Sequence, residues 1–304
     1  MTLKEACKKG AAQLKESGIE ESSPDAWYLL EYVTGLSRAA YLLDGQKEME
    51  AELEERFFSL IKKRAGRIPL QHLTGVQEFM GLEFLVNEHV LIPRQDTESL
   101  VEEALYILGG KPGARGDGKD GSPALSGDTI SLLDLCTGSG CILLSILKHA
   151  EKNGAIPLCG TGSDISREAL DMAERNAKKL GIEAEFVHSD LFGHVEGRFS
   201  MIVSNPPYIR TADIPSLQDE VSRYEPALAL DGGGDGLCFY RKIIQESRQY
   251  LVPGGYLLFE IGYDQAPDVC RLMWEAGFRR IAVKKDLAGL DRVVSGMYDV
   301  GEES

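Results

Sequence analysis

From residue 129 onward, segments with the apolar pattern of buried strands alternate with segments whose apolar residues recur at helical spacing. The predicted strands cover 130–135, 156–163, 184–188, 199–204 and 255–261, with two more near the end of the chain. Helices are predicted to begin near residues 141, 166, 239 and 264. Strands that alternate with helices form a parallel sheet covered by helices on both faces. This part of the chain is therefore predicted to be an α/β domain.

The residues before this domain carry a different pattern. Residues 1–68 show helical signals only, which predict a small helical domain. Residues 69–93 shift toward strand patterns, including 82–86 and 89–92, and we interpret them as a β-hairpin that joins two domains. The second domain would then cover 94–304.

Within that second domain, a helix is predicted at 99–108. The segment 109–128 that follows is rich in glycine, proline, serine and charged residues. Such a composition is typical of a flexible surface excursion.

The composition and net charge disfavour several classes of protein. The 304 residues are 43% hydrophobic, enough for about two domains, and the net charge of −15 disfavours a protein that binds nucleic acid through its phosphates. No apolar run is long enough for a membrane helix, and the start lacks the apolar region of a signal peptide. The six cysteines show no metal-ligand or disulfide spacing. We therefore expect a cytoplasmic protein without a metal site.

The turn after the first strand of the α/β domain is glycine-rich. Asp134 lies at the end of this strand, and the turn contains Cys136, Thr137, Gly138, Ser139 and Gly140. Glycine lets the backbone approach a ligand closely, and the following helix start supplies N–H groups. A dinucleotide fingerprint would need a further glycine where Leu143 stands. The alternative is a glycine-rich turn that binds no ligand.

Aspartates follow the next two predicted strands. Asp164 can accept hydrogen bonds from both hydroxyl groups of a ribose, although it could instead cap the helix that begins near Ser166. Asp190 could accept a hydrogen bond from an adenine amino group, with Leu191 in apolar contact beside the ring. The alternative for Asp190 is an ordinary turn residue.

The segment Asn205, Pro206, Pro207 and Tyr208 follows the fourth predicted strand. The prolines stiffen the backbone and remove N–H donors, so the Asn205 side-chain oxygen and the Pro206 carbonyl can converge on one NH2 group. Tyr208 offers a flat face to a planar substrate. The arrangement suits an amide-like nitrogen, although a rigid turn without a function would show the same residues.

The order and spacing of these four turns resemble the class I S-adenosylmethionine-dependent methyltransferases, whose fold is Rossmann-like. By that resemblance, Asp134 and the turn 136–140 hold the methionine part of S-adenosylmethionine. Asp164 holds the ribose, Asp190 and Leu191 hold the adenine, and Asn205 also contacts the cofactor.

Further motifs narrow the resemblance. They are His72 to Gly75 with Glu78 and Phe79, Ile92 to Glu98, Ser204 to Tyr208, and Asp286 to Arg292. Together they are similar to the peptide-chain release factor glutamine N5-methyltransferases. The chain departs from that family's pattern at Cys136, where glycine is more frequent, and at Gln95, where proline is usual.

This resemblance implies a reaction and a partner. A methyl group would pass from S-adenosylmethionine to the glutamine of the Gly-Gly-Gln loop of class 1 release factors, supporting translation termination. Asn205, Pro206 and Tyr208 would be catalytic, and Asn205 to Tyr208 would bind the glutamine. The helical domain would hold the release factor, and we expect a monomer that does not contact nucleic acid directly.

Three alternatives share part of the pattern. A sister enzyme could methylate a glutamine of a ribosomal protein, and an adenine-N6 methyltransferase could use the same acceptors on an exocyclic amine. The charge of −15 disfavours the latter, because it must hold phosphates and flip a base. A catalytically silent module that binds a translation factor would not need Asn205, Tyr208 and Asp164 together.

Overall fold

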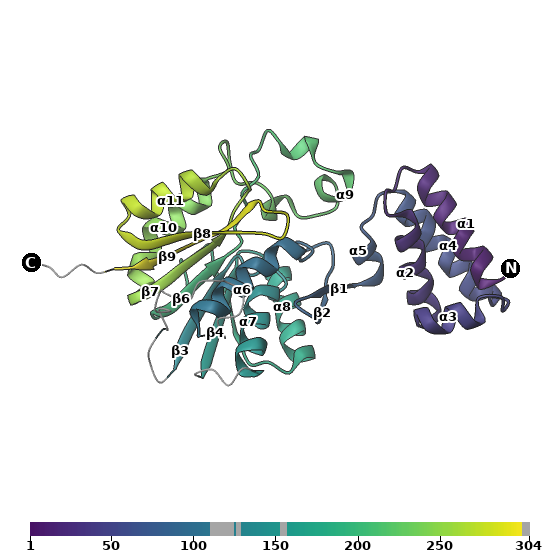
Figure 1. The fold of residues 1–304 in the computed structure, drawn as a ribbon, viewed down its shortest axis with the longest axis horizontal. Coiled ribbons are helices and arrows are strands. Elements are labelled where there is room, and N and C mark those ends of the chain that lie inside the picture. Colours follow the sequence, from purple (N-terminus) through teal and green to yellow (C-terminus); the bar gives the residue numbers. More distant parts are fainter. Residues whose placement is uncertain (110–124, 126–128, 153–156, 300–304) are drawn as a thin grey trace, which may run out of the picture. The chain divides into compact units, whose positions relative to one another are not determined.

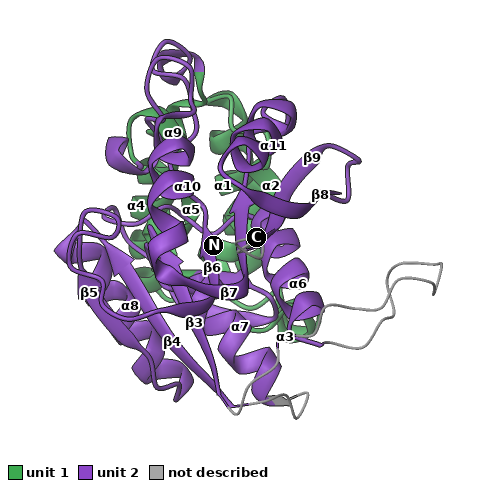
Figure 2. Ribbon diagram, turned by 90° about the vertical axis from the view of Figure 1, so that its left-hand side faces the viewer, with its two compact units in different colours: residues 1–76, 217–224 green, residues 77–216, 225–304 purple. Residues whose placement is uncertain are grey.

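The computed structural model describes residues 1–109, 125, 129–152 and 157–299, which divide into two compact units (Figure 2). The first unit comprises residues 1–76 together with 217–224, and the second comprises the rest. The predicted excursion 109–128 lies outside the described residues, apart from Gly109 and Leu125. The predicted domain limits at residues 68 and 93 stay predictions, because a compact unit need not be a segment that folds alone.

The first unit is a bundle of short helices. Its α1 (Leu3–Glu16) begins with a reciprocal cap, in which Thr2 and Glu5 each accept a hydrogen bond from the other's backbone N–H. This cap satisfies two N–H groups that a helix start leaves unpaired. The remaining helices are α2 (Ser22–Thr34), α3 (Arg38–Asp44), α4 (Ala51–Ala65) and α5 (Leu70–Thr74). Apolar side chains of α1, α2 and α4 form one core around the fully buried Phe57.

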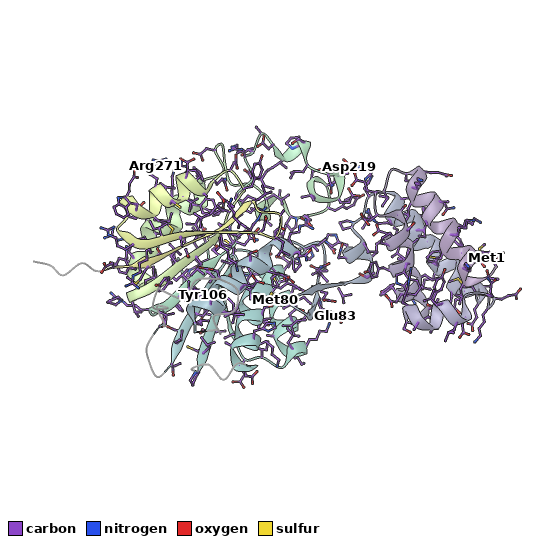
Figure 3. The ribbon with its side chains drawn as sticks, in the orientation of Figure 1. Met1, Met80, Glu83, Tyr106, Asp219 and Arg271 are labelled. Atoms are coloured by element: carbon purple, nitrogen blue, oxygen red, sulfur yellow. The ribbon has the colours of Figure 1, made fainter. Side chains whose placement is uncertain are left out.

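Residues 217–224 belong to this first unit although they follow the fourth parallel strand of the second. They contain the short helix α9 (Asp219–Ser222), whose first residue is labelled in Figure 3. Glu220 accepts hydrogen bonds from Arg64 at 3.0 Å and from Arg67 at 3.2 Å. These partners lie more than 150 residues away in the chain, so the sequence pattern gave no sign of the contact.

A β-hairpin occupies the middle of the predicted joining segment. Its strands β1 (Val76–Phe79) and β2 (Leu82–Leu85) turn at Met80 and the glycine after it, both with positive φ, as a tight two-residue hairpin turn requires. The Met80 N–H donates to the Glu98 carboxylate at 2.7 Å, and the Glu83 carboxylate pairs with Lys179 of the helix α8 (Arg167–Leu180) at 2.6 Å (Figure 3). Side-chain contacts therefore hold the hairpin turn and β2 against the helices of the second unit.

Two expectations for the segment 69–93 were wrong. Residues 70–74 form the helix α5, and 89–92 contain no strand. Val90 is nevertheless buried, because it packs with Ala169 and Met172 of a helix rather than in a sheet. Alternating burial at 89–92 thus arises from side-chain packing without strand pairing.

The second unit is built on a seven-stranded sheet with the order β5-β4-β3-β6-β7-β9-β8. The strands β3 to β7 run parallel, β9 is antiparallel to β7, and β8 is antiparallel to β9. This topology confirms the predicted α/β fold class. The seven strands of this sheet are β3 (Ile130–Leu135), β4 (Leu158–Asp164), β5 (Glu185–His188), β6 (Phe199–Ser204), β7 (Leu251–Glu260), β8 (Phe278–Lys285) and β9 (Asp291–Tyr298).

Helices cover both faces of this sheet (Figure 1). Successive residues of β3, such as Leu132 and Leu133, belong to two separate hydrophobic clusters, as expected where side chains alternate between faces. One cluster includes α6 (Glu98–Ile107), α7 (Cys141–Lys152) and α8 (Arg167–Leu180), and the other includes α10 (Cys238–Tyr250) and α11 (Ala266–Glu275). None of the helices in the described part of the chain combines the length and apolar character needed to cross a membrane.

Candidate active site

The carboxyl ends of the parallel strands meet at one edge of the sheet. In the strand register, Leu135 at the end of β3 lies opposite Ser163 of β4 and Ser204 of β6. The turns that follow these strands therefore start at nearly the same level, which is where open α/β sheets bind their ligands. A cavity of about 540 Å³ lies at this edge, formed entirely by residues of the second unit.

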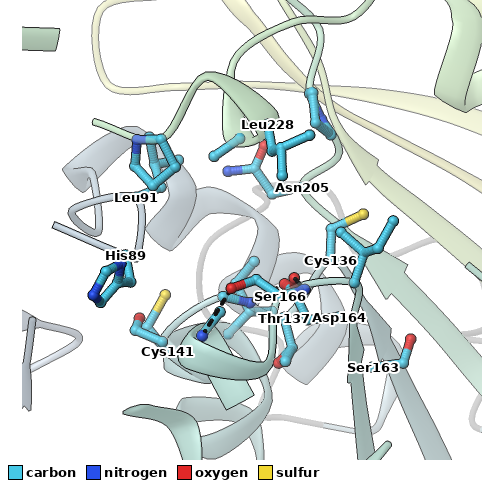
Figure 4. Close-up of a pocket in the computed structure, with 18 of the residues that line it drawn as sticks. His89, Leu91, Cys136, Thr137, Cys141, Ser163, Asp164, Ser166, Asn205 and Leu228 are labelled. Carbon is cyan, nitrogen blue, oxygen red and sulfur yellow. Dashed lines mark hydrogen bonds between the residues drawn. The ribbon is translucent and has the colours of Figure 1, made fainter. Parts of the chain in front are cut away.

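The cavity brings together most of the residues that the sequence singled out. Among them, nine line it: Cys136, Thr137, Gly138, Ser139, Asp164, Asp190, Leu191, Asn205 and Pro207. Four others are not on its surface: Asp134, Gly140, Pro206 and Tyr208. In the close-up, Asn205 lies near Leu228, above the group formed by Thr137, Asp164 and Ser166 (Figure 4).

Asp134 contacts the turn 136–140 from the protein interior. It is fully buried, and its Oδ2 accepts a hydrogen bond from the Thr137 hydroxyl at 2.6 Å. Burial raises the pKa of Asp134 to about 7, although the Thr137 hydrogen bond opposes this shift. Asp134 does not line the cavity, so its hydrogen bond from Thr137 acts on the shape of the turn and not on a ligand.

Three residues of the turn 136–140 lie in the left-handed region, one of them Gly140 with φ 78°. Cys136 has φ 59° and Gly138 has φ 55°. A Cβ built on Gly138 meets no atom within 4 Å, so its backbone faces open space. Glycine adopts such a φ without the steric cost that Cys136 carries, which explains why a glycine would suit position 136. Burial raises the pKa of the Cys136 thiol above its usual range, so this side chain is a poor nucleophile.

Asp164 ties the turn to the end of β4. Its Oδ2 accepts a hydrogen bond from the Gly138 N–H and its Oδ1 accepts one from the Ser166 N–H, both at 2.9 Å. The cap of α8 is the Ser166 side chain, which accepts from the Ala169 N–H, so the alternative of Asp164 as the helix cap was wrong. Burial raises the pKa of Asp164, opposed by these backbone hydrogen bonds. A carboxylate has about four acceptor positions, so two remain for a ligand.

The turn after β5 supplies a further wall of the cavity. Leu191 has a positive φ of 49°, and its carbonyl accepts a hydrogen bond from the Ser189 hydroxyl at 2.8 Å. Asp190 is exposed, while Leu191 is buried. This part of the cavity therefore combines an accessible carboxylate with an apolar surface.

The loop after β6 carries Asn205 on the opposite wall. Asn205 is partly exposed and lines the cavity with Pro207; both prolines are buried, and Pro206 does not line the cavity. The Tyr208 carbonyl accepts a hydrogen bond from the Gln265 side chain at 3.1 Å, and the Tyr208 hydroxyl donates to Glu260 at 3.4 Å. Tyr208 is thus held at both its backbone and its hydroxyl.

Two glycines allow the backbone to pass close to this loop. A Cβ on Gly232 would lie 2.7 Å from Tyr208 Cα and 2.8 Å from the Pro207 carbonyl oxygen. A Cβ on Gly236 would lie 2.7 Å from the Gln265 side-chain nitrogen. The sequence analysis missed these residues, although the glycine run from 232 to 234 was a visible signal of close backbone approach.

The sequence analysis also missed an ion pair at the cavity, between the partly exposed Arg94 side chain and the buried Glu225 carboxylate. One Arg94 nitrogen donates to both carboxylate oxygens of Glu225 at 2.7 Å. The Glu225 side chain is 1% exposed, and its burial raises its pKa while Arg94 opposes the shift. Arg94 lies within a motif that the sequence analysis quoted, but no local signal linked it to a residue 131 positions away.

These residues fit S-adenosylmethionine. Cavities that enclose a small organic ligand commonly measure about 300–1,000 Å³, which includes the observed volume. Asp164 offers carboxylate positions for two ribose hydroxyls, Gly138 leaves room along the turn, and Leu191 provides an apolar contact for a ring. The described residues contain no group of three side chains placed to hold a metal ion.

Comparisons with known proteins agree with this geometry. Family models for the PrmC N-terminal domain and the methyltransferase small domain match residues 5–75 and 124–221. A methyltransferase structure from Pyrococcus furiosus shares the fold, with a TM-score of 0.50 and 17% identity over 79% of this chain and all of that chain.

Two curated relatives match nearly the whole chain. The release factor glutamine methyltransferase of Geobacter sulfurreducens is 39% identical and covers 93% of this chain and 92% of its own length. The enzyme of the same name from Clostridium acetobutylicum is 38% identical, covering 97% of this chain and 98% of its own. Identity at this level over nearly full length places the chain in the release factor glutamine methyltransferase family.

Proposed function

We propose that this protein transfers a methyl group from S-adenosylmethionine to the side-chain amide nitrogen of the glutamine in the Gly-Gly-Gln loop of class 1 release factors. The observation that carries the proposal is that Asn205 lies on the same cavity as Asp164 and the turn 136–139. A methyl donor and an amide nitrogen could then be bound side by side. An enzyme with this substrate would act in the cytoplasm, where translation takes place, and we expect it to act as a monomer.

The proposed cofactor residues surround one half of the cavity. Asp164 would accept hydrogen bonds from the ribose, Asp190 and Leu191 would hold the adenine, and the turn 136–140 would hold the methionine part. Asp134 would act by keeping the turn in shape through Thr137. Asn205, on the opposite wall, would contact both the cofactor and the substrate. When bound, S-adenosylmethionine supplies an electrophilic methyl group on its sulfonium.

The proposed substrate residues act on an amide that is a weak nucleophile, because its nitrogen lone pair is delocalised into the carbonyl. The Asn205 side-chain oxygen and the Pro206 carbonyl would accept hydrogen bonds from the two N–H groups of the amide. This would direct the lone pair toward the methyl carbon and favour pyramidal nitrogen in the transition state. Pro207 would line the entry of the side chain, and Tyr208 would hold the amide plane.

The reaction needs no strong base. The substrate nitrogen would attack the methyl carbon as the carbon–sulfur bond breaks, with S-adenosylhomocysteine as the leaving group. The methylated amide nitrogen, then positively charged and strongly acidic, would give its extra proton to water. The residues of the chain therefore work by orienting the amide and excluding competing geometries.

Mass spectrometry of a purified release factor after incubation with this protein and S-adenosylmethionine tests the proposal. We expect a gain of one methyl group on the Gly-Gly-Gln glutamine, located by peptide mapping. Asn205→Ala should lower the rate by about 100-fold or more, as losses of transition-state hydrogen-bond partners do. Gln245→Ala, which removes an exposed amide side chain from α10, should methylate normally.

Binding of S-adenosylmethionine, measured by calorimetry, separates the possible failures. A wild-type protein that binds the cofactor but leaves the release factor unmethylated would redirect the search to a ribosomal-protein glutamine or a nucleic-acid adenine. Full activity in Asn205→Ala would show that Asn205 has no part in the reaction.

A further inference from the structure

A buried carboxyl group lies directly behind the proposed substrate loop. Glu260, the last residue of β7, is 2% exposed. Its Oε1 accepts a hydrogen bond from the Tyr208 hydroxyl at 3.4 Å, and its backbone carbonyl accepts one from the Tyr240 hydroxyl at 2.9 Å. Burying a carboxyl group is costly unless hydrogen bonds compensate. Neither the sequence analysis nor the reaction described above gives Glu260 a role.

The segment that follows β7 also holds the backbone of Tyr208. Gln265 donates from its side-chain nitrogen to the Tyr208 carbonyl at 3.1 Å, and its side-chain oxygen accepts from the Gly262 N–H at 2.9 Å. Residues 260–265 therefore bind Tyr208 at two points, its backbone carbonyl and its hydroxyl. Two points of attachment at opposite ends of a residue define the orientation of the ring between them.

The hydrogen bond between Tyr208 and Glu260 has room to shorten. Hydrogen bonds between two oxygens are commonly about 2.7 Å long, and those of active sites are often longer before the substrate binds. A charged carboxylate strengthens such a bond compared with a neutral acceptor. The charge state of Glu260 should therefore decide how firmly Tyr208 is held.

We propose that Glu260 is a positioning residue for the methylation reaction, because it holds the hydroxyl of Tyr208 and so fixes the ring that supports the substrate amide. This inference rests on the proposed function for its effect on turnover. The contact itself can be tested without the reaction. Neither Glu260 nor Tyr208 is among the residues that line the cavity, but Tyr208 is partly exposed while Glu260 is buried, so the effect of Glu260 on the substrate passes through Tyr208.

A double-mutant cycle tests whether Glu260 acts through Tyr208. Glu260→Leu and Tyr208→Phe should each lower kcat by about 10-fold, the effect of losing one hydrogen bond to a charged group. The double variant should be no slower than the single variants, since both remove the same contact. The affinity for S-adenosylmethionine should not change. Effects that multiply to about 100-fold in the double variant would overturn the proposal.

Glu260→Gln is the conservative variant, because it keeps an oxygen acceptor but cannot ionise. Burial raises the pKa of Glu260 to about 7, opposed by hydrogen bonding from Thr97 and Tyr208 and by the charge of Arg292. The wild type should therefore lose kcat as pH falls below 7, where Glu260 becomes neutral. Glu260→Gln should lack this fall. Identical pH profiles for both proteins would contradict the role of the charge.

Several other groups face Glu260 or its surroundings and titrate or carry charge. They are Asp96, Cys141, Tyr208, Tyr240 and Arg292. All of them are present in both proteins, so the difference between the two profiles isolates Glu260. This comparison also remains available if Glu260→Leu fails to fold.

Carbon-13 NMR of protein labelled at the tyrosine Cζ tests the contact without substrate or cofactor. The Tyr208 signal is assigned by its loss in Tyr208→Phe. It should move in Glu260→Gln, because the hydroxyl then bonds to a neutral acceptor. An unmoved signal would overturn the inference. A moved signal with no release-factor methylation by the wild type would leave the contact intact and reject the proposed function instead.

Discussion

Two fully buried carboxyl groups, Asp134 and Glu260, lie at the carboxyl ends of two strands of the same sheet and support opposite walls of the cavity in different ways. Burial raises the pKa of each to about 7. Asp134 accepts its hydrogen bond from Thr137, three residues along the chain, whereas Glu260 accepts from Tyr208, 52 residues away. Asp134 thus holds its turn through a contact that is local in the chain, whereas Glu260 holds the proposed substrate wall through a contact between distant segments.

The largest expected effect tests the substrate wall. Gly232→Ala would place a Cβ 2.7 Å from Tyr208 Cα and 2.8 Å from the Pro207 carbonyl oxygen, so the loop must move. Displacing a substrate-positioning loop by about 1 Å can lower a rate by about 100-fold. We expect kcat for the release factor to fall by this amount, while calorimetry shows unchanged affinity for S-adenosylmethionine.

Gly234→Ala is the matched control, because a Cβ there meets no atom within 4 Å and its φ is not positive. It should turn over like the wild type. If Gly232→Ala also weakened cofactor binding, the proposed cofactor wall and the proposed substrate wall would not be independent of each other.

The next effect tests Asp134 through the pH dependence of stability. Its folded pKa of about 7 exceeds the ordinary unfolded value of about 3.9. Its stabilising contribution is therefore complete below about pH 4 and is lost as pH rises through 7. Asp134→Asn cannot ionise, so at pH 8 urea unfolding should show it to be more stable than the wild type by up to about 4 kcal/mol. This difference should shrink toward pH 4.

Asp286 provides a control of opposite sign. Hydrogen bonds from the Leu290 N–H and from Arg292 lower its pKa. Its contribution is therefore present at neutral pH and lost as pH falls through the lowered value. Asp286→Asn should consequently be less stable than the wild type at pH 8. An Asp134→Asn variant that behaves in the same way would show that Asp134 is stabilised in its charged form.

The sequence predicted the fold where local patterns dominate. The parallel strands β3, β4 and β6 were predicted within two residues at each end, and β3 and β6 are short, mostly apolar runs that end at a turn. The turn residues 136–139, Asp164 and Asn205 line one cavity, since parallel strands deliver their following turns to one edge. Residues 89–92 were predicted wrongly because burial against α8 imitates a strand pattern.

The rest of the site depends on contacts that no local pattern carries. Arg94 meets Glu225 across 131 positions, and Gln265 meets Tyr208 across 57. The sequence analysis expected Tyr208 to offer a flat face to a planar substrate, and no local pattern indicated that its hydroxyl meets a buried acid. Side-chain partners of this kind are set by the packing of the completed sheet, so they follow from the fold and could not be read before it.

A smaller effect tests the proposed cofactor wall directly. Asp164→Asn removes the charge that would accept the ribose hydroxyls and presents an NH2 group to the Gly138 or Ser166 N–H. Exchanging a charged acceptor for a neutral one should weaken S-adenosylmethionine binding by about 10-fold in calorimetry. Turnover at saturating cofactor should change much less. Glu168→Gln, which also lines the cavity, should bind normally, and a loss of kcat without a loss of affinity in Asp164→Asn would exchange the roles of the two walls.

The smallest expected effect tests backbone strain in the turn 136–140 of the proposed cofactor wall. Cys136 has φ 59°, a region that costs a residue with a Cβ about 1–2 kcal/mol. Cys136→Gly should relieve this strain but lose the packing of a partly buried thiol, leaving a gain of about 1 kcal/mol or less in the free energy of unfolding. Cys136→Ala is the matched control, because it loses the thiol and keeps the Cβ. Urea unfolding should therefore give Cys136→Gly a higher free energy of unfolding than Cys136→Ala. The reverse order would mean that the backbone of this turn is not strained, so that hydrogen bonds determine its shape.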